Sequence, residues 1–469
     1  MKMLSGQLLR QMPDHRVDVL EPGGKAAKGW ITCEIGTNLR FDAEGLHSYC
    51  SASLKDEDFQ RVYDAFLLGA AVQFCDHTKA RPATAWGRNM VLRLPVHDRE
   101  HWNSPAVSDS LRDALSFLTG DRWHFEFIDR KSAEQAPRQG SLLMPDASSI
   151  VLPYSDGLDS RAVAGLAELD RTRQVTRVRL GLSDLPRRRR RSDEKPFTQV
   201  PYSVRFSPKK AVETSGRSRG FRFTLLSGIA AYLSNAHDVF MTESGQGALG
   251  PTLVPVGQAY EDYRNHPLFT KKMSVFLDAL FGHEVRYSFP RLWYTKGETV
   301  AAYVAAYGSD AELLETHSCW QDSRRVSVSG RKRQCGVCAA CMLRRLSLYA
   351  AGSQEAPENY VWERLGASRL EDGMASDFPL SKVTKAMREY AIAGTLHMDH
   401  LAALRSSPLA TGVLDRQASR LAECLSIPKE QAVEKLGRLI DTHNSEWHRF
   451  LASLGRQSFV HQWTAGVTR

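Results

Sequence analysis

Hydrophobic positions alternate or recur with helical spacing in the N-terminal region of the chain. Strand-like runs lie near 30–35 and 89–94, and helix-period patterns lie near 57–73 and 107–119. No recognisable catalytic motif accompanies them. The pattern therefore predicts an N-terminal α+β domain over residues 1–145, with partner binding as its candidate role.

Two further regions follow. In residues 146–352 strands and helices alternate, which is typical of an α/β domain with a parallel sheet. Residues 353–469 have almost no strand signal. Their helix-period apolar positions lie in Val383–Ile392, His400–Leu404, Leu414–Leu425, Ala432–Leu439 and Trp447–Leu454. We predict a catalytic α/β domain followed by a C-terminal helical domain.

Composition and charge narrow the class of protein. The 469 residues include 62 Lys and Arg against 53 Asp and Glu, a net charge of +9. This excess suits ligands that carry phosphate but does not require them. Apolar stretches are short, and eight cysteines are too sparse for a disulfide scaffold. We expect a cytoplasmic protein without a membrane segment.

The strongest local motif joins a strand-like run at 150–154 to a helical pattern at 161–169. The connecting loop consists of Ser155, Asp156, Gly157, Leu158, Asp159 and Ser160. Unpaired N–H groups at a helix N-terminus attract anions, and the two serine hydroxyls can donate to phosphate oxygens. Asp159 can cap the helix or help to hold Mg²⁺. We predict a phosphate-binding loop; a capped strand–turn–helix junction is the alternative.

A second motif consists of four cysteines. They are Cys319, Cys335, Cys338 and Cys341. A Cys-x-x-Cys turn brings two thiolates to one ion, and the other two complete a tetrahedron around Zn²⁺. Nearby arginines and lysines would balance the thiolate charge. We predict a structural zinc site, with an iron–sulfur cluster or unliganded buried thiols as alternatives.

These motifs resemble known families. The loop resembles the Ser-Gly-Gly-x-Asp-Ser loop of the PP-loop ATP pyrophosphatases, and it departs at Asp156, where that family usually has glycine. Ser318-Cys319, the later cysteines and Arg344 resemble the metal motif of the QueC (7-cyano-7-deazaguanine synthase) family. Trp293–Glu298 resembles its Thr-Lys-x-Glu helix start. The resemblance covers roughly 147–351 and implies a PP-loop parallel-sheet domain.

The same comparison supplies further candidate residues. Arg217 and Arg219 precede an apolar helix, where QueC has a Pro-Gly-Arg-Asn segment, and could clamp phosphates. Lys296 would stabilise the leaving charge. Glu243 and Gln246 follow a strand and are candidate readers of a purine-like base. The alternatives are a solvated basic turn, an exposed helix-start lysine and a glycine-rich surface turn.

The resemblance implies a reaction and its cofactors. The implied cofactors are ATP, Mg²⁺ and Zn²⁺. A carboxylate such as that of 7-carboxy-7-deazaguanine would attack the α-phosphorus of ATP. The resulting acyl-adenylate would be displaced by an amine. That amine is ammonia in QueC itself, which goes on to the nitrile.

The additional domains resemble the extended QueC-like proteins of anti-phage defence islands, called QatC. Those relatives suggest that the amine belongs to a partner protein from the same operon. The alternative is a catalytically silent, zinc-stabilised protein that binds nucleic acid or acts as a scaffold, supported by Asp156 and the arginine run 187–191.

Overall fold

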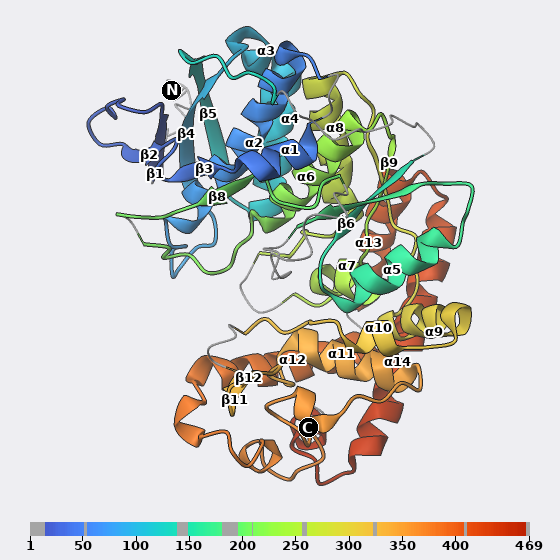
Figure 1. Ribbon diagram of the computed structural model, residues 1–469. Coiled ribbons are helices and arrows are strands. Elements are labelled where there is room, and N and C mark those ends of the chain that lie inside the picture. The colour runs from blue at the N-terminus through green and yellow to red at the C-terminus, as the bar shows by residue number, and fades with distance from the viewer. Residues whose placement is uncertain are drawn as a thin grey trace, which may run out of the picture. The chain divides into compact units, whose positions relative to one another are not determined.

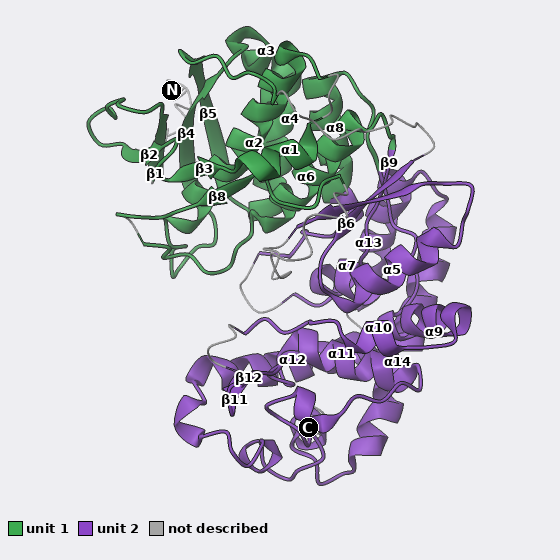
Figure 2. Cartoon of the chain, viewed as in Figure 1, with its two compact units in different colours: residues 1–147, 182–237, 269–286 green, residues 148–181, 238–268, 287–469 purple. Residues whose placement is uncertain are grey.

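The computed structural model describes residues 15–50, 54–137, 149–180, 196–208, 210–255, 260–321, 326–407 and 410–465. Contacts group the chain into two compact units, shown in Figure 2. Unit 1 comprises 1–147, 182–237 and 269–286, and unit 2 comprises 148–181, 238–268 and 287–469. The three consecutive domains stay a prediction, because contact grouping reports packing and not independent folding. The arginine run at 187–191 lies outside the described residues.

Unit 1 contains a four-stranded sheet in the order β2-β1-β4-β5. Its strands are β1 (His15–Leu20), β2 (Ile31–Glu34), β4 (Asn89–Val96) and β5 (Arg122–Asp129). The helices of this unit are α1 (Ala43–Tyr49), α2 (Asp56–His77), α3 (Arg99–Asn103), α4 (Pro105–Thr119), α6 (Arg219–Leu233) and most of α8 (Pro267–Phe281). A short antiparallel pair joins β3 (Leu39–Phe41) to β8 (Tyr202–Val204).

The predicted helices and strands of the N-terminal region are confirmed, but their pairing differs from an α+β arrangement. All three neighbouring pairs of the four-stranded sheet are parallel. Helices α3 and α4 lie between β4 and β5 in the chain, so the connection is long enough for a parallel crossover. The sequence pattern missed β5, whose side chains are mostly exposed, and without it the crossover could not be recognised.

Unit 2 contains the sheet β10-β9-β6-β7. Its strands are β6 (Ile150–Tyr154), β7 (Val175–Arg179), β9 (Asp238–Phe240) and β10 (Arg286–Ser288), the last beginning at the boundary with unit 1. Strand β6 is buried along its whole length and pairs in parallel with β7 and β9. A central parallel strand of this kind, followed by helix α5 (Leu158–Glu168), confirms the α/β prediction for this region.

The remaining elements of unit 2 are mainly helical, as Figure 1 shows. They are α7 (Gly245–Leu253), α9 (Lys296–Tyr307), α10 (Ala311–Leu314), β11 (Ser327–Val328), β12 (Arg331–Lys332), α11 (Ala339–Ala350), α12 (Lys385–Ala403), α13 (Ala410–Leu425), α14 (Lys429–Leu454) and α15 (Phe459–Ala465). The apolar patterns at 432–439 and 447–454 form one helix, α14. Trp362 and Trp447 share a hydrophobic core with Cys335, Cys338 and Cys341, so the helical region and the cysteine motif are packed together.

None of the helices in the described part of the chain has the length and apolar character needed to cross a membrane.

Candidate functional site

The loop between β6 and α5 is closed by its own hydroxyl groups. Ser155 Oγ lies 3.0 Å from Ser160 Oγ and accepts a hydrogen bond from the Gly157 N–H at 3.3 Å. Ser160 Oγ in turn lies 3.2 Å from Thr242 Oγ1, just beyond β9. Gly157 is the extended residue before α5, and the helix begins at Leu158. The hydroxyl groups therefore gather where the backbone N–H groups of a helix begin, which is a favourable place for a phosphate.

Asp156, which stands where the PP-loop pattern usually has glycine, pairs with an arginine. Its carboxylate accepts from Arg179 Nη2 at 2.9 and 3.2 Å, and Arg179 is the last residue of β7. The Asp156 side chain is 61 % exposed, whereas that of Arg179 is 18 % exposed. An opposite charge at this distance offsets the repulsion between Asp156 and a bound phosphate. No local pattern in the sequence predicts this pairing.

Lys296 and Asp159 form a buried ion pair. Lys296 Nζ lies 2.5 Å from Asp159 Oδ2, and the Ser244 hydroxyl donates to Asp159 Oδ1 at 2.5 Å. Burial disfavours the ammonium, but Asp159 and Glu243 outweigh it and hold the pKa of Lys296 above its ordinary value. The predicted loop aspartate and lysine are therefore together, with the lysine charged. Both carboxylate oxygens of Asp159 have protein donors, so a contact with Mg²⁺ stays a prediction.

The N-terminus of α9 fixes the position of Lys296. Thr295 and Glu298 form a capping box, in which each side chain accepts from the backbone N–H of the other residue. Glu298 also pairs with Arg438 of α14. This cap explains why the Thr-Lys-x-Glu segment begins a helix.

Glu243 lies beside the same ion pair. Its Oε1 is 3.9 Å from Lys296 Nζ, and its Oε2 accepts from Asn265 Nδ2 at 2.9 Å. Burial, followed by the neighbouring Asp159 carboxylate, raises the pKa of Glu243. The side chain folds back over Gly247, where an added Cβ would lie 1.9 Å from Glu243 Oε1. Glycine at 247 is thus required for this position of the glutamate.

Gln246 is buried and engaged at both ends of its amide. Its Oε1 accepts from the Lys296 backbone N–H at 2.7 Å, and its Nε2 lies 2.8 Å from His443 Nδ1. The structure thus brings Gln246 to the lysine rather than to an open surface. Its predicted contact with a base stays a prediction.

Arg217 and Arg219 belong to unit 1, whereas the loop of 155–160 belongs to unit 2. The Arg217 guanidinium lies over the Trp86 ring, 4.6 Å from its centroid, and that of Arg219 lies 4.8 Å from the Phe223 centroid. The next residue, Ser218, donates its N–H to Asp76, which forms a buried ion pair with Arg88. The role of both arginines toward phosphate stays a prediction.

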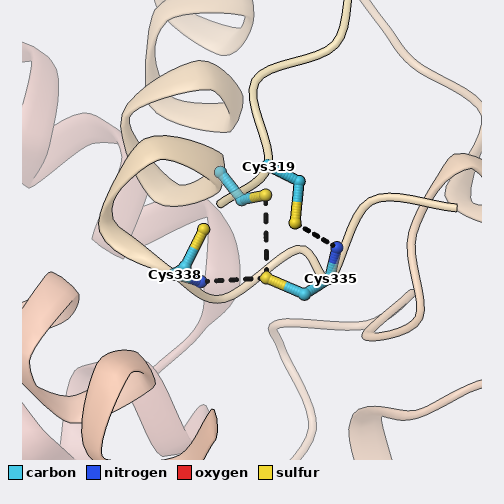
Figure 3. A group of neighbouring side chains, drawn as sticks. Cys319, Cys335 and Cys338 are labelled. Carbon is cyan, nitrogen blue, oxygen red and sulfur yellow. Dashed lines mark hydrogen bonds between the residues drawn. The ribbon is translucent and has the colours of Figure 1, made fainter. Parts of the chain in front are cut away.

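The four predicted metal ligands come together, as Figure 3 shows for Cys319, Cys335 and Cys338. All four Sγ atoms lie within 4.8 Å of one another. The Sγ atoms of Cys335 and Cys341 are 3.7 Å apart, close to the roughly 3.8 Å edge of a tetrahedron with Zn–S bonds of about 2.3 Å. The donor set fits a zinc ion, and the same thiols would also suit iron–sulfur chemistry.

Backbone groups support the cysteine cluster. The N–H of Cys335 donates to Cys319 Sγ at 3.1 Å, and the N–H of Cys338 donates to Cys335 Sγ at 3.3 Å. Gly336 adopts a φ of +90°, and a Cβ there would meet the Trp362 carbonyl oxygen at 2.9 Å. Glycine inside the Cys-x-x-Cys turn is therefore required by both conformation and space.

Arg344 and Arg345, which follow Cys341 on α11, connect the cysteine cluster to its surroundings. Arg344, fully buried, pairs with Glu355 and donates to Thr316 Oγ1 beside α10. Arg345 donates to the carbonyl oxygens of Trp362 and Glu363. The arginine that closes the motif thus ties α11 to the segment that leads to Cys319.

Several site residues were missed by sequence reasoning. They are Arg179, Thr242, Ser244, Asn265, His443 and Glu446. Thr242 and Ser244 flank Glu243 at the end of β9, and that position was itself a usable signal. His443 and Glu446 lie on a helix whose pattern indicates only amphipathic packing, so nothing local marks them.

These features define an α/β protein with a candidate phosphate loop and a cluster of four thiols that could hold a metal ion. The family model for the queuosine biosynthesis protein QueC matches residues 247–352. The match supports a QueC-like family for this part of the chain and indicates an ATP-using synthase. It includes Lys296 and the four cysteines, but the loop at 155–160 precedes it and α14 follows it. Comparisons with curated proteins and with solved structures gave no match.

Proposed function

We propose that this chain uses ATP to adenylate a carboxylate and then transfers the acyl group to an amine. The observation that carries the proposal is the Lys296–Asp159 ion pair, which joins the loop of 155–160 to the QueC-like region at 2.5 Å. A lysine ammonium and helix N–H groups at one place are suited to the charge that develops during phosphoryl or nucleotidyl transfer. The resemblance to QueC adds the carboxylate substrate class, a 7-carboxy-7-deazaguanine-like compound.

In the first step, a substrate carboxylate oxygen would bond to the α-phosphorus of ATP while the bond from that phosphorus to the β-phosphate bridging oxygen breaks. The products are an acyl-adenylate and pyrophosphate. The loop N–H groups, the Ser155 and Ser160 hydroxyls and Lys296 would bind the phosphate oxygens. Mg²⁺, when bound, would neutralise phosphate charge. Asp159 would hold Lys296 in place through their ion pair.

In the second step, an amine nitrogen would bond to the acyl carbon, and the carbon–oxygen bond to AMP would break. The amine loses a proton, and an amide and AMP are released. We propose a partner-protein amine in an anti-phage defence system as the acceptor; nitrile synthesis with ammonia is the competing reaction. The zinc-type site would brace the domain and take no part in either step.

A product analysis tests the proposal. The purified chain would be incubated with Mg-ATP and 7-carboxy-7-deazaguanine, alone, with ammonium, and with proteins encoded beside it, and the products would be weighed by mass spectrometry. AMP and pyrophosphate formation that requires the carboxylate is expected, with mass added to a partner protein. Release of ADP, or the absence of AMP in every mixture, would overturn the proposal.

The second candidate is a catalytically silent scaffold that binds nucleic acid, favoured by the excess of basic residues. It predicts retention of oligonucleotides that is lost at moderate salt, without AMP formation. Measuring AMP formation and oligonucleotide retention on the same preparation distinguishes the two functions.

A further inference from the structure

Helix α14 lies outside the QueC-like segment, yet its inner face contacts the site. It packs against α7, α11, α12 and α13 within unit 2 (Figure 1). His443 and Glu446 on this face are 0 % and 4 % exposed. Buried polar groups of this kind need partners, and those of His443 and Glu446 include residues of the site.

His443 forms a chain of hydrogen bonds to the backbone of Lys296. Its Nε2 lies 2.9 Å from the Met398 carbonyl oxygen, which can only accept, so Nε2 carries the proton and Nδ1 is the acceptor. Gln246 Nε2 must therefore donate to Nδ1, which turns Gln246 Oε1 toward the Lys296 N–H. Burial lowers the pKa of His443 to about 4, so the imidazole stays neutral at ordinary pH.

Glu446 makes a second contact at the same helix start. Its Oε1 accepts from Thr295 Oγ1 at 2.7 Å, and Thr295 is the N-cap of α9. Its Oε2 is buried without a hydrogen-bond partner in the described part of the chain. The capping hydroxyl that precedes Lys296 is thus held from α14.

Two glycines near the site show how closely side chains of α14 approach the starts of α7 and α9. A Cβ on Gly297 would lie 2.7 Å from Glu446 Oε1, and a Cβ on Gly245 would lie 2.6 Å from Leu439 Cδ2 and 2.3 Å from the Leu292 carbonyl oxygen. These distances are too short for any side chain. Both glycines, one at the start of α7 and one at the start of α9, leave room for residues of α14.

We propose that α14 is part of the active centre, with His443 and Glu446 as positioning residues for Lys296. His443 sets the orientation of Gln246 and through it the first turn of α9, while Glu446 fixes the cap. The inference rests on the proposed function and assigns to the C-terminal helical region a task other than partner docking. It also gives Gln246 a positioning role in place of base recognition.

Two amide variants of His443 separate positioning from packing, because each places its amide near a different ring nitrogen. His443→Asn keeps an acceptor near the place of Nδ1, whereas His443→Gln keeps a donor near the place of Nε2 and loses that acceptor. We expect His443→Asn to form pyrophosphate within about threefold of the wild-type kcat, and His443→Gln to fall by about tenfold or more. The KM for ATP should change less than kcat. Exposed His448, on the same helix, supplies the control pair His448→Asn and His448→Gln.

The outcomes are distinguishable from failure of the proposed function. If the wild type makes no AMP, the proposed function fails, and binding of a non-hydrolysable ATP analogue then compares the variants. If the wild type is active but both His443 variants keep wild-type kcat, or both lose it in proportion to their melting temperatures, the positioning role is overturned.

Discussion

The cysteine cluster and the polar cluster around Lys296 are built in different ways. The four thiols come from one segment, 319–341, and their ligand set follows from residue type and spacing. The groups around Lys296 come from α5, the end of β9, the start of α9 and α14. A cluster of metal-type ligands can therefore be specified by residues that are close together in the sequence. The polar cluster around Lys296 instead needs residues from elements across the whole unit.

The largest effect is expected from breaking the local cluster. Cys338→Ser should abolish stoichiometric metal binding and lower the free energy of unfolding by several kcal/mol, because metal binding and folding are coupled. Elemental analysis and calorimetry measure both. Cys424→Ser, at a half-buried cysteine outside the cluster, is the control and should change neither. Iron with visible absorption, instead of zinc, would assign the site to iron–sulfur chemistry.

In the polar cluster around Lys296, removing the lysine charge should slow the reaction most. Lys296→Met should slow pyrophosphate formation by about a hundredfold or more, since transition-state charge loses its ammonium partner. Lys385→Met, at a side chain that is 90 % exposed, is the control.

The same substitution leaves the buried Asp159 carboxylate without an opposite charge, which costs roughly 3–5 kcal/mol. Adding Asp159→Asn should restore the melting temperature but not the activity. Activity of the single variant above half the wild-type rate would exclude Lys296 from the reaction.

Glu446 of α14 should make the stability of the fold depend on pH. Burial raises the pKa of Glu446 to about 7, against the opposing effect of its bond from Thr295. This value of about 7 also includes the raising effect of nearby Glu298 and the lowering effects of Arg449 and Arg438 on the pKa. As pH rises from about 4.5 through about 7, the folded state should lose stability of about 3 kcal/mol, because the unfolded state holds the proton less tightly.

Glu446→Gln should remove this loss while keeping an acceptor for Thr295. Denaturant unfolding at pH 5 and pH 8 measures it, with exposed Glu434→Gln as the control. An unchanged slope of stability with pH would show that Glu446 does not titrate in this range.

The smallest effect concerns the departure at Asp156. Arg179→Ala should raise the KM for ATP by about tenfold, because the Asp156 carboxylate then faces the phosphates without its partner. The double variant Asp156→Gly/Arg179→Ala should recover most of the loss. If the double variant binds ATP as weakly as Arg179→Ala, the arginine contacts phosphate by itself, and simple neutralisation is wrong.

The sequence could predict what depends on neighbours along the chain. The strand, loop and helix at 150–169 and the cysteine motif were foreseen because their residues are consecutive or closely spaced. The parallel pairing of β5 was missed because its exposed side chains weaken the strand pattern. His443 and Glu446 reach Gln246 and Thr295 across long sequence separations, and no local pattern encodes such a contact.

The most direct measurement follows oxygen from the substrate into the products. A carboxylate substrate labelled with oxygen-18 would be converted in the presence of Mg-ATP and an amine, and AMP and pyrophosphate would be weighed by mass spectrometry. Adenylation at the loop of 155–160 predicts one labelled oxygen in AMP and none in pyrophosphate, with no transfer in the Lys296→Met variant. Label in inorganic phosphate, with ADP as the nucleotide product, would contradict attack at the α-phosphorus.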